Sequence, residues 1–331
     1  MITVICPTYN EETYIANCLE AIIQSDYPKE NMEVLFVDGM SSDKTRDIIL
    51  SYSKEHNYIK LLSNPHKTVP YAMNQGIKEA KGEVIIRIDA HSDYPPNYFP
   101  ALVRYLKELN ADNVGGVWNT DVFHKNKKTL AIKEVLANKF GVGNSYFRIG
   151  TDKIMEVDTV PFGCYKKDVF ERFGLYDTRL TRNQDIELNR RIKRGGGKIF
   201  LIPDIYCTYY ARETWKAIMK NNFQNGKWNV LTLSYTKAFD TLSIRHFVPL
   251  IFVLSLILPA LLAIINLKFI YIAIASLFAY LLLITYVSIS LAIQKKGNIL
   301  YLLITFFALH LSYGIGSLVG IITSLFGGKK N

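Results

Sequence analysis

The residues with the clearest chemical potential lie at the end of an apolar stretch. Residues 84–91 read Val-Ile-Ile-Arg-Ile-Asp-Ala-His, so Asp89 and His91 follow a predicted buried strand. Side chains at i and i+2 of an extended segment point the same way, so both can hold one divalent cation. A carboxylate and a neutral imidazole suit Mn²⁺ or Mg²⁺ held mainly by a diphosphate. The alternative is a helix-capping Asp and a surface His.

A second carboxylate ends an earlier apolar stretch. Asp38 follows Val-Leu-Phe-Val at residues 34–37 and begins a polar turn. A carboxylate at a strand end can accept hydrogen bonds from a base or a ribose. Asp43, later in the turn, is a residue type suited to cap the next helix. A plain turn also explains this segment.

A third candidate, Asp185, lies in a polar stretch, Arg-Asn-Gln-Asp-Ile-Glu-Leu, at residues 182–188. Asp185 and Glu187 are spaced i and i+2 and cannot share a helix face. We therefore expect one of them to face a crevice and the other to face solvent. A carboxylate in the crevice can act as a general base on an acceptor hydroxyl. Without further context, a surface helix is the favoured interpretation of this stretch.

Strands and helices alternate over the first ninety residues. The short apolar segments predict strands at 2–6, 33–38, 59–62 and 84–89, and helical patterns fall at 12–25, 43–53 and 69–80. Repeated strand–helix units predict a doubly wound parallel sheet. Ligands bind at the carboxyl ends of such strands. Those ends carry Pro7, Thr8, Tyr9, Asn10, Glu11, Asp38, Asp89 and His91, so we expect these residues to share one crevice.

The middle of the chain is less regular. We predict a helix at 98–109, a strand at 114–119, a helix at 182–193 and a strand at 198–202, while 124–156 gives no clear pattern. The glycines at 195–197 follow a predicted helix, where glycine normally ends the helix. A phosphate-binding loop is the alternative.

The last third of the chain is very apolar. Between Phe247 and Phe326 there is no acidic residue, although the whole chain has a net charge of +10. Three apolar segments, near 247–265, 269–293 and 299–326, are close to or above the roughly 20 residues that span a bilayer. Gly316 and Gly320 would allow close helix packing. A basic band from Arg190 to His246 fits an anionic cytoplasmic leaflet.

The segment before these spans has its own pattern. Apolar residues recur from Thr214 to Phe223 opposite two lysines, which predicts an amphipathic helix in the membrane interface, or a surface helix packed on the core. Gln224, Lys227 and Trp228 follow it. An amide, a cation and an indole can bind a sugar or a diphosphate; an interfacial aromatic anchor is the alternative.

The sequence also argues against nucleic-acid binding, a cysteine-ligated metal site and secretion. No recognition-helix or RNA-binding signature accompanies the positive charge, so we expect no nucleic-acid partner. The four cysteines have no metal-ligand spacing and are expected to be reduced. The chain starts directly with a strand pattern, so we expect no signal peptide and a cytosolic N-terminal part.

In combination, these motifs resemble the membrane-bound family-2 glycosyltransferases with the GT-A fold. The chain is most similar to the succinoglycan-type glucosyltransferases of exopolysaccharide synthesis. The matching segments, in order, are Val4–Glu12, Val37–Gly39 with Ser42–Thr45, Ala72–Gly76 with Ala80–Glu83, Asp89–His91, Val160–Gly163, Gln184–Asp185 and Gln224–Trp228.

The resemblance implies roles for these residues. Asp185 would be the catalytic base, and Asp89 with His91 would hold Mn²⁺ or Mg²⁺. Gln224, Lys227 and Trp228 would contact the acceptor or gate the site. The residues implied in donor binding are Pro7, Thr8, Tyr9, Glu11, Asp38, Asn74 and Asp89.

Three positions depart from the family pattern. His91 replaces the second Asp of the Asp-x-Asp motif, as in the succinoglycan-like subgroup. Gln184 replaces the Glu that usually precedes the base. Lys227 replaces an Arg, and lysine cannot make the same bidentate contact, which puts processive addition in question.

The resemblance implies an inverting, metal-dependent glycosyltransferase at the cytosolic membrane face. It would use a nucleotide-diphosphate sugar, UDP-linked, and a lipid-linked or polysaccharide acceptor. We expect a GT-A domain at 1–210, an amphipathic interface segment at 211–246 and a multi-pass membrane region at 247–331. A polyprenyl-phosphate sugar transferase and a non-catalytic sensor of nucleotide sugars are the alternatives.

Overall fold

The computed structural model describes residues 1–237 and 246–326. The chain divides into two compact units. One contains Met1–Asn119 and Tyr146–Tyr210, and the other contains Thr120–Ser145 and Ala211–Asn331. The parts of the predicted interface and membrane segments at 238–245 and 327–331 lie outside the described residues.

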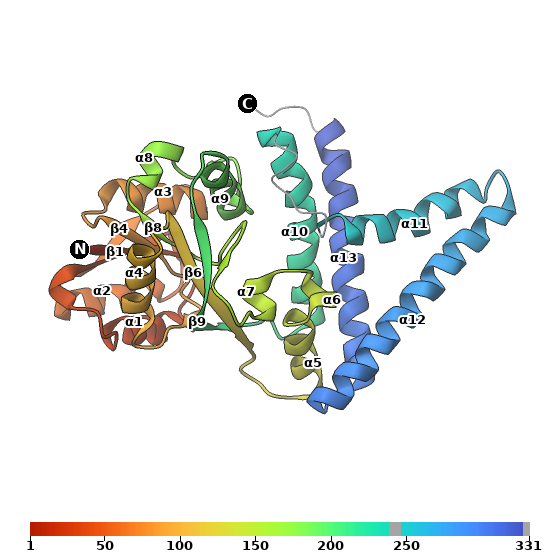
Figure 1. Cartoon of the computed structure of the whole chain (residues 1–331), viewed down its shortest axis with the longest axis horizontal. Helices are drawn as coiled ribbons and strands as arrows, with labels where there is room; N and C mark the ends of the chain where they lie inside the picture. Colours follow the sequence, from red (N-terminus) through yellow and green to blue (C-terminus); the bar gives the residue numbers. More distant parts are fainter. Residues whose placement is uncertain (238–245, 327–331) are drawn as a thin grey trace. The chain divides into compact units, whose positions relative to one another are not determined.

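The first unit is built on one mixed sheet (Figure 1). Its strand order is β3-β2-β1-β4-β8-β6-β9-β5, and β7 pairs with β9. The strands are β1 Ile2–Thr8, β2 Met32–Asp38, β3 Ile59–Ser63, β4 Val84–Arg87, β5 Ser92–Asp93, β6 Asn113–Asp121, β7 Met155–Glu156, β8 Cys164–Lys166 and β9 Ile199–Tyr210.

The four strands predicted in the first ninety residues are parallel, as expected. The register pairs Thr8 with Asp38 and Ile5 with Arg87, so the polar residues that follow these strands leave the same edge of the sheet. Beyond β4 the strands are no longer parallel. The neighbouring strand β8 is antiparallel to β4 and to β6, so the parallel arrangement covers only the first half of this unit.

Alternating strand residues build two apolar layers. Val4 and Phe36 face one cluster, which α1 (Ile15–Ile23), α2 (Thr45–Glu55) and α4 (Tyr98–Glu108) cover. Ile5 and Leu35 face the other, which α3 (Val69–Glu79), α8 (Val169–Phe173) and α9 (Gln184–Arg194) cover. Both faces of the sheet are therefore buried, which explains why its parallel strands read as continuous apolar stretches.

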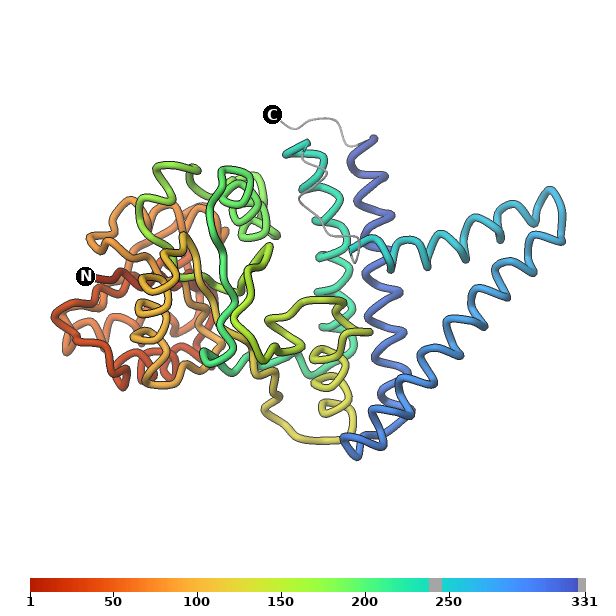
Figure 2. The backbone as a smooth tube through the Cα atoms, in the orientation of Figure 1, coloured from red at the N-terminus to blue at the C-terminus, as the bar shows by residue number. Residues whose placement is uncertain are grey.

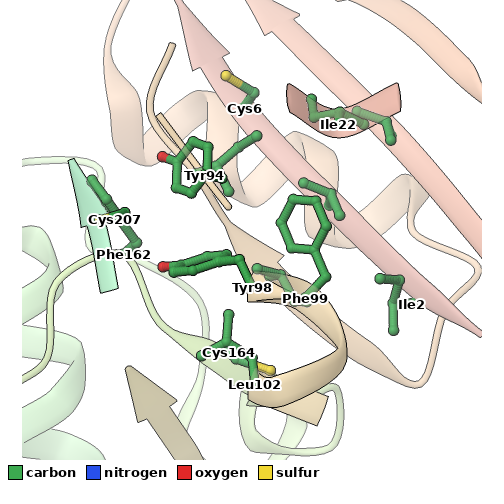
Figure 3. Close-up of a cluster of buried hydrophobic side chains, with 14 of the residues drawn as sticks. Ile2, Cys6, Ile22, Tyr94, Tyr98, Phe99, Leu102, Phe162, Cys164 and Cys207 are labelled. Atoms are coloured by element: carbon green, nitrogen blue, oxygen red, sulfur yellow. The ribbon is translucent and has the colours of Figure 1, made fainter. Parts of the chain in front are cut away.

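Aromatic rings fill one end of the first layer (Figure 3). The ring centroid of Tyr94 lies 4.9 Å from that of Tyr98 and 6.1 Å from that of Phe162. Cys6, Cys164 and Cys207 lie in the same cluster. All four cysteines of the chain are described, buried and unbridged, as the sequence predicted.

The second unit is helical. Figure 2 shows α10 (Trp215–Thr236) and α13 (Ile299–Phe326) running side by side. The Trp215 Nε1 atom donates a hydrogen bond of 3.0 Å to Thr305 Oγ1 between them. The other described helices of this unit are α5 Lys127–Leu136, α6 Lys139–Val142, α11 Val248–Leu262, the short 3₁₀ helix η4 Leu267–Phe269 and α12 Ile270–Lys295. The first unit also contains the short 3₁₀ helix η1 Lys29–Asn31 and the helix α7 Tyr146–Ile149.

Two helices, rather than three, are long and apolar enough to cross a membrane among the described residues. They are Leu267–Lys295, which includes η4, and Ile299–Phe326. The remaining predicted span, 247–265, forms α11, which has 15 residues. At 1.5 Å per residue it reaches about 22 Å, less than a hydrocarbon core of about 30 Å. The prediction counted Ala263, Ile264 and Ile265, but the helix ends at Leu262.

Candidate functional site

The predicted metal segment does not continue the strand. β4 ends at Arg87, and residues 90–91 form a turn, so Asp89 and His91 are not successive same-side positions of an extended segment. The expectation based on strand alternation was therefore wrong in its geometry. The side chains remain accessible, with 23% of Asp89 and 31% of His91 exposed.

The backbone of Asp89 is held by the aromatic cluster. Its N–H donates a hydrogen bond of 2.8 Å to the hydroxyl of Tyr94, and this hydroxyl donates one of 3.1 Å back to the Asp89 carbonyl oxygen. Burial raises the pKa of the Tyr94 hydroxyl well above its ordinary value, so it keeps its proton as a donor. The rigid core thus fixes where the carboxylate emerges.

Arg87 connects the two candidate carboxylates. Its Nη2 atom lies 3.2 Å from Asp89 Oδ1, and its Nη1 atom lies 3.9 Å from Asp185 Oδ2. The Arg87 side chain is 8% exposed. Burial alone would lower the pKa of this guanidinium, but the charges of Asp89 and Asp185 outweigh burial and raise it. The prediction of chemistry at Asp89 and Asp185 did not include Arg87, although a cation within an apolar strand was a visible signal.

Asp185 lies at the start of α9, where the helix N-terminus favours negative charge. Its Oδ1 atom accepts a hydrogen bond of 2.9 Å from the Ile186 N–H. Glu187 does not face solvent as expected. It is buried and forms an ion pair of 2.7 Å with Arg191 one turn later, which explains how a carboxylate is tolerated there.

The loops after β1 and β2 are bound together, as the predicted shared crevice requires. The Asn10 N–H donates to Ser41 Oγ at 2.8 Å, and the Ser42 N–H donates to Asn10 Oδ1 at 2.9 Å. The Glu11 N–H donates to Thr45 Oγ1 at 2.8 Å. Asp43 was predicted to cap α2, but the N-cap residue is Lys44. Asp43 lies one residue earlier and accepts a hydrogen bond of 3.0 Å from the N–H of Thr45, the first residue of α2.

Asp38 is fully buried within these loops. Its carboxylate accepts hydrogen bonds from the Ser41 N–H at 2.9 Å and from Arg46 Nη1 at 2.8 Å, and Thr8 Oγ1 lies 3.5 Å away. These contacts use the carboxylate to fix the loop. Tyr9 is 48% exposed at the surface of the same loop, after Pro7.

Imidazole and carboxylate also meet across the loops. His91 Nδ1 lies 3.4 Å from Glu11 Oε1. Within residues 1–237 and 246–326, no group of three or more His, Cys, Asp or Glu side chains is placed to hold a metal ion. The donor types of Asp89 and His91 nevertheless fit Mn²⁺ or Mg²⁺, because such ions take much of their coordination from diphosphate oxygens and water.

Asn74, implied in donor binding, is used by a neighbouring loop. Its Nδ2 atom donates to the Tyr176 carbonyl oxygen at 2.8 Å, and its Oδ1 atom accepts from the Tyr176 N–H at 2.9 Å. We therefore expect Asn74→Ala to lower the free energy of unfolding by about 1–3 kcal/mol, because two partners lose their bonds. Denaturant unfolding measures this, with Gln75→Ala as the matched control. Equal stability of both variants would show that the paired bonds contribute nothing.

Gln224, Lys227 and Trp228 all lie on α10 and therefore in the second unit, separate from the unit that carries Asp89 and Asp185. All three side chains are half-buried. Val160–Gly163, the segment that resembles the acceptor loop of the family, lies in the first unit. There the Gly163 carbonyl oxygen accepts a hydrogen bond of 3.0 Å from the Arg87 N–H, and the Phe162 ring lies 5.5 Å from that of Trp118.

The fold and the loops define a class of protein: an α/β domain whose parallel strand ends carry carboxylates, as in nucleotide-sugar transferases of the GT-A fold. Residues 3–174 match the family described as Glycosyl transferase family 2. The chain belongs to this family.

Two curated relatives support the membership. The chain is 35% identical over 233 residues to a dolichyl N-acetyl-α-D-glucosaminyl phosphate 3-β-D-2,3-diacetamido-2,3-dideoxy-β-D-glucuronosyltransferase of Methanococcus voltae, covering 68% of this chain and 71% of that protein. It is 29% identical over 265 residues to the succinoglycan biosynthesis protein ExoA of Rhizobium meliloti, covering 80% and 78%. The predicted likeness to succinoglycan-type enzymes is confirmed.

Solved structures confirm the GT-A-like fold. A mannosyltransferase of Pyrobaculum calidifontis, in complex with GDP-mannose and Mn²⁺, aligns with a TM-score of 0.60 at 18% identity, covering 99% of this chain and 88% of that one. TarS of Staphylococcus aureus, in complex with UDP-GlcNAc, aligns with a TM-score of 0.54 at 16% identity, covering 100% and 93%.

Proposed function

We propose that this chain moves a sugar, with inversion, from a UDP-linked donor to a hydroxyl of a lipid-linked or growing polysaccharide acceptor. The observation that carries the proposal is the position of Arg87 between Asp89 and Asp185, at 3.2 Å and 3.9 Å. A donor-side carboxylate and a candidate base thus lie around one cation at the carboxyl end of β4. Transfer to a hydroxyl needs a base close to the donor, and the short distance between these groups supports that placement.

In the proposed reaction Asp185 accepts the proton of the acceptor hydroxyl. The acceptor oxygen forms a bond to the anomeric carbon, and the bond from that carbon to the diphosphate oxygen breaks on the opposite side. The electron pair leaves with UDP. A single displacement inverts the configuration and needs no covalent intermediate on the chain. The β-linkage in the name of the Methanococcus relative is consistent with inversion of an α-linked donor.

On the donor side, the loop of Pro7, Thr8, Tyr9 and Glu11 would border the nucleoside. Asp38 would act by fixing this loop, since its carboxylate already binds Ser41 and Arg46. Asn74 would act through its two bonds to Tyr176 rather than by direct contact.

Asp89 and His91 would hold Mn²⁺ or Mg²⁺ together with the diphosphate. A bound ion would neutralise charge that develops on the leaving group. The ion in the Pyrobaculum mannosyltransferase complex supports a requirement for a divalent metal.

The acceptor side is proposed to be a membrane surface. The Methanococcus relative is named for a dolichyl-phosphate-linked sugar. Two helices of this chain are long and apolar enough to span a bilayer, which supports a membrane-bound, multi-pass protein. The first unit is proposed to lie in the cytosol because the basic band from Arg190 to His246 fits an anionic cytoplasmic leaflet. Gln224, Lys227 and Trp228 would contact or gate the acceptor. The acceptor in that relative's name already carries a sugar. This favours transfer to a sugar hydroxyl over transfer to a polyprenyl phosphate.

The first test is nucleotide binding by the detergent-solubilised chain. UDP and GDP are titrated by calorimetry with Mn²⁺ and with EDTA. We expect Mn²⁺ to strengthen UDP binding, and Asp89→Ala to weaken it about a hundredfold, because the ion loses a carboxylate ligand. Glu108→Ala, which removes a surface carboxylate on α4, is the control.

Three results would change the proposal. Stronger binding of GDP than UDP would reassign the donor. Binding without product, tested with UDP-sugars and lipid-linked sugar acceptors, would favour a sensor. No binding of either nucleotide by the folded chain would contradict the site itself.

A further inference from the structure

Arg87 holds an unusual position for a charged residue. It is the last residue of β4, its Cα pairs with that of Ile5 on β1, and its side chain is more than nine-tenths buried. A buried cation is unfavourable unless charges and hydrogen bonds compensate for the lost water. The compensation here is incomplete. The Arg87 Nε and Nη1 atoms have no hydrogen-bond partner in the described part of the chain.

The groups around Arg87 are of two kinds. Asp89 and Asp185 are partly exposed carboxylates, with 23% and 30% of their side chains exposed. Tyr165 and Tyr176 are buried hydroxyls, and burial raises the pKa of both above the ordinary value of tyrosine. Burial raises the pKa of the Tyr165 hydroxyl well above its ordinary value, so this hydroxyl is neutral. The two carboxylates are therefore the anionic partners of the guanidinium among these groups.

Asp89 is also a proposed ligand of the metal ion. A guanidinium 3.2 Å from its Oδ1 atom and a divalent cation are two positive charges that compete for one carboxylate. Arg87 can also pair with Asp185, so loss of the Asp89 contact would leave it beside the base. A planar guanidinium can address two carboxylates in fixed directions, which a lysine ammonium cannot.

We propose that Arg87 is a positioning residue with two effects of opposite sign. It holds Asp185 in the orientation in which the base works, and it competes with the metal ion for Asp89. The inference rests on the proposed function and concerns the same site. Arg87 would weaken the dependence of donor binding on the metal ion, and it would also support the transfer step.

The test is Arg87→Met, which keeps the volume and removes the charge. Two quantities are measured on the full chain: kcat for transfer, and the ratio of the UDP dissociation constants without and with Mn²⁺. We expect kcat to fall about a hundredfold, because the base loses its orientation. We expect the ratio to rise about tenfold, because Mn²⁺ no longer competes with a guanidinium. Arg104→Met, on the surface of α4, is the matched control.

Arg87→Lys separates charge from geometry. Lysine keeps the positive charge, but its single ammonium group sits at the end of a shorter side chain and cannot address two carboxylates in fixed directions. We expect the Mn²⁺ ratio to stay near that of the wild type and kcat to fall about tenfold. This variant also decides the question if Arg87→Met does not fold, as judged by its melting temperature.

The outcomes distinguish this inference from the proposed function. If the wild type shows neither Mn²⁺-dependent UDP binding nor transfer, the proposed function fails. If the wild type shows both, two results overturn the inference. In one, Arg87→Met changes neither kcat nor the ratio of the UDP dissociation constants without and with Mn²⁺. In the other, kcat and this ratio fall together. A purely structural role of Arg87 predicts that joint fall.

Discussion

Asp185→Asn should abolish sugar transfer and leave nucleotide binding intact. An asparagine keeps the size of the side chain, and its oxygen can still accept the hydrogen bond from the Ile186 N–H. It cannot accept a proton from the acceptor hydroxyl at neutral pH. We expect kcat to fall about 10⁴-fold, the upper range for a general base, with the UDP dissociation constant changed less than about threefold.

The measurement combines steady-state transfer from a UDP-sugar with calorimetric UDP titration. Asp168→Asn, an exposed carboxylate at the start of α8, is the matched control and should behave as the wild type. Unchanged transfer by Asp185→Asn would remove Asp185 from the reaction. Transfer that persists only with polyprenyl phosphate would instead favour the alternative activity, since a phosphate oxygen is already ionised and needs no base.

The two carboxylates and the loops of the site are organised by groups that carry no chemistry themselves. Tyr94 holds the backbone of Asp89 from within the aromatic core, and Asn10 ties the first donor loop to the second. Preorganisation of this kind lets a site present charge without rearranging during reaction. Substitutions at Tyr94 and Asn10 should therefore affect turnover although neither residue is proposed to react.

The sequence predicted the first half of the catalytic unit well because its signals are local. Short apolar stretches that end in polar turns identify parallel strands, and parallel strands bring their ends together. The contact between the β1 and β2 loops follows from this rule alone. The prediction failed at β4, where Arg87 ends the strand two residues early. The apolar Ile88 concealed that end.

The remaining errors have non-local causes. β8 is three residues long and enters the sheet between β4 and β6, which no local pattern indicates. Residues 124–156 gave no clear pattern; 124–145 belong to the helical unit, and 146–156 return to the first unit. Glu187 was expected in solvent. Its i,i+4 partner Arg191 was visible in the sequence, but the carbonyl oxygens of Phe173 and Leu175, which bind Arg191, were not.

The close packing predicted from Gly316 and Gly320 is present, and α10 is the partner helix. A Cβ atom built at Gly316 would lie 2.0 Å from the Phe223 carbonyl oxygen, and one at Gly320 would lie 2.7 Å from that of Lys227. On α10, a Cβ at Gly226 would lie 2.0 Å from the Tyr313 carbonyl oxygen. These obstacles are backbone atoms, so a larger residue must push the helices apart.

Gly316→Ala should therefore destabilise the helical unit although alanine is the better helix former. The gain in helix propensity is about 1 kcal/mol, whereas separating the helices weakens contacts along their length. We expect a net loss of about 3–4 kcal/mol. Thermal unfolding in detergent measures it, with Gly297→Ala as control because its nearest neighbour is a flexible leucine side chain at 3.3 Å. A melting temperature equal to or above that of the wild type would contradict backbone contact between α10 and α13.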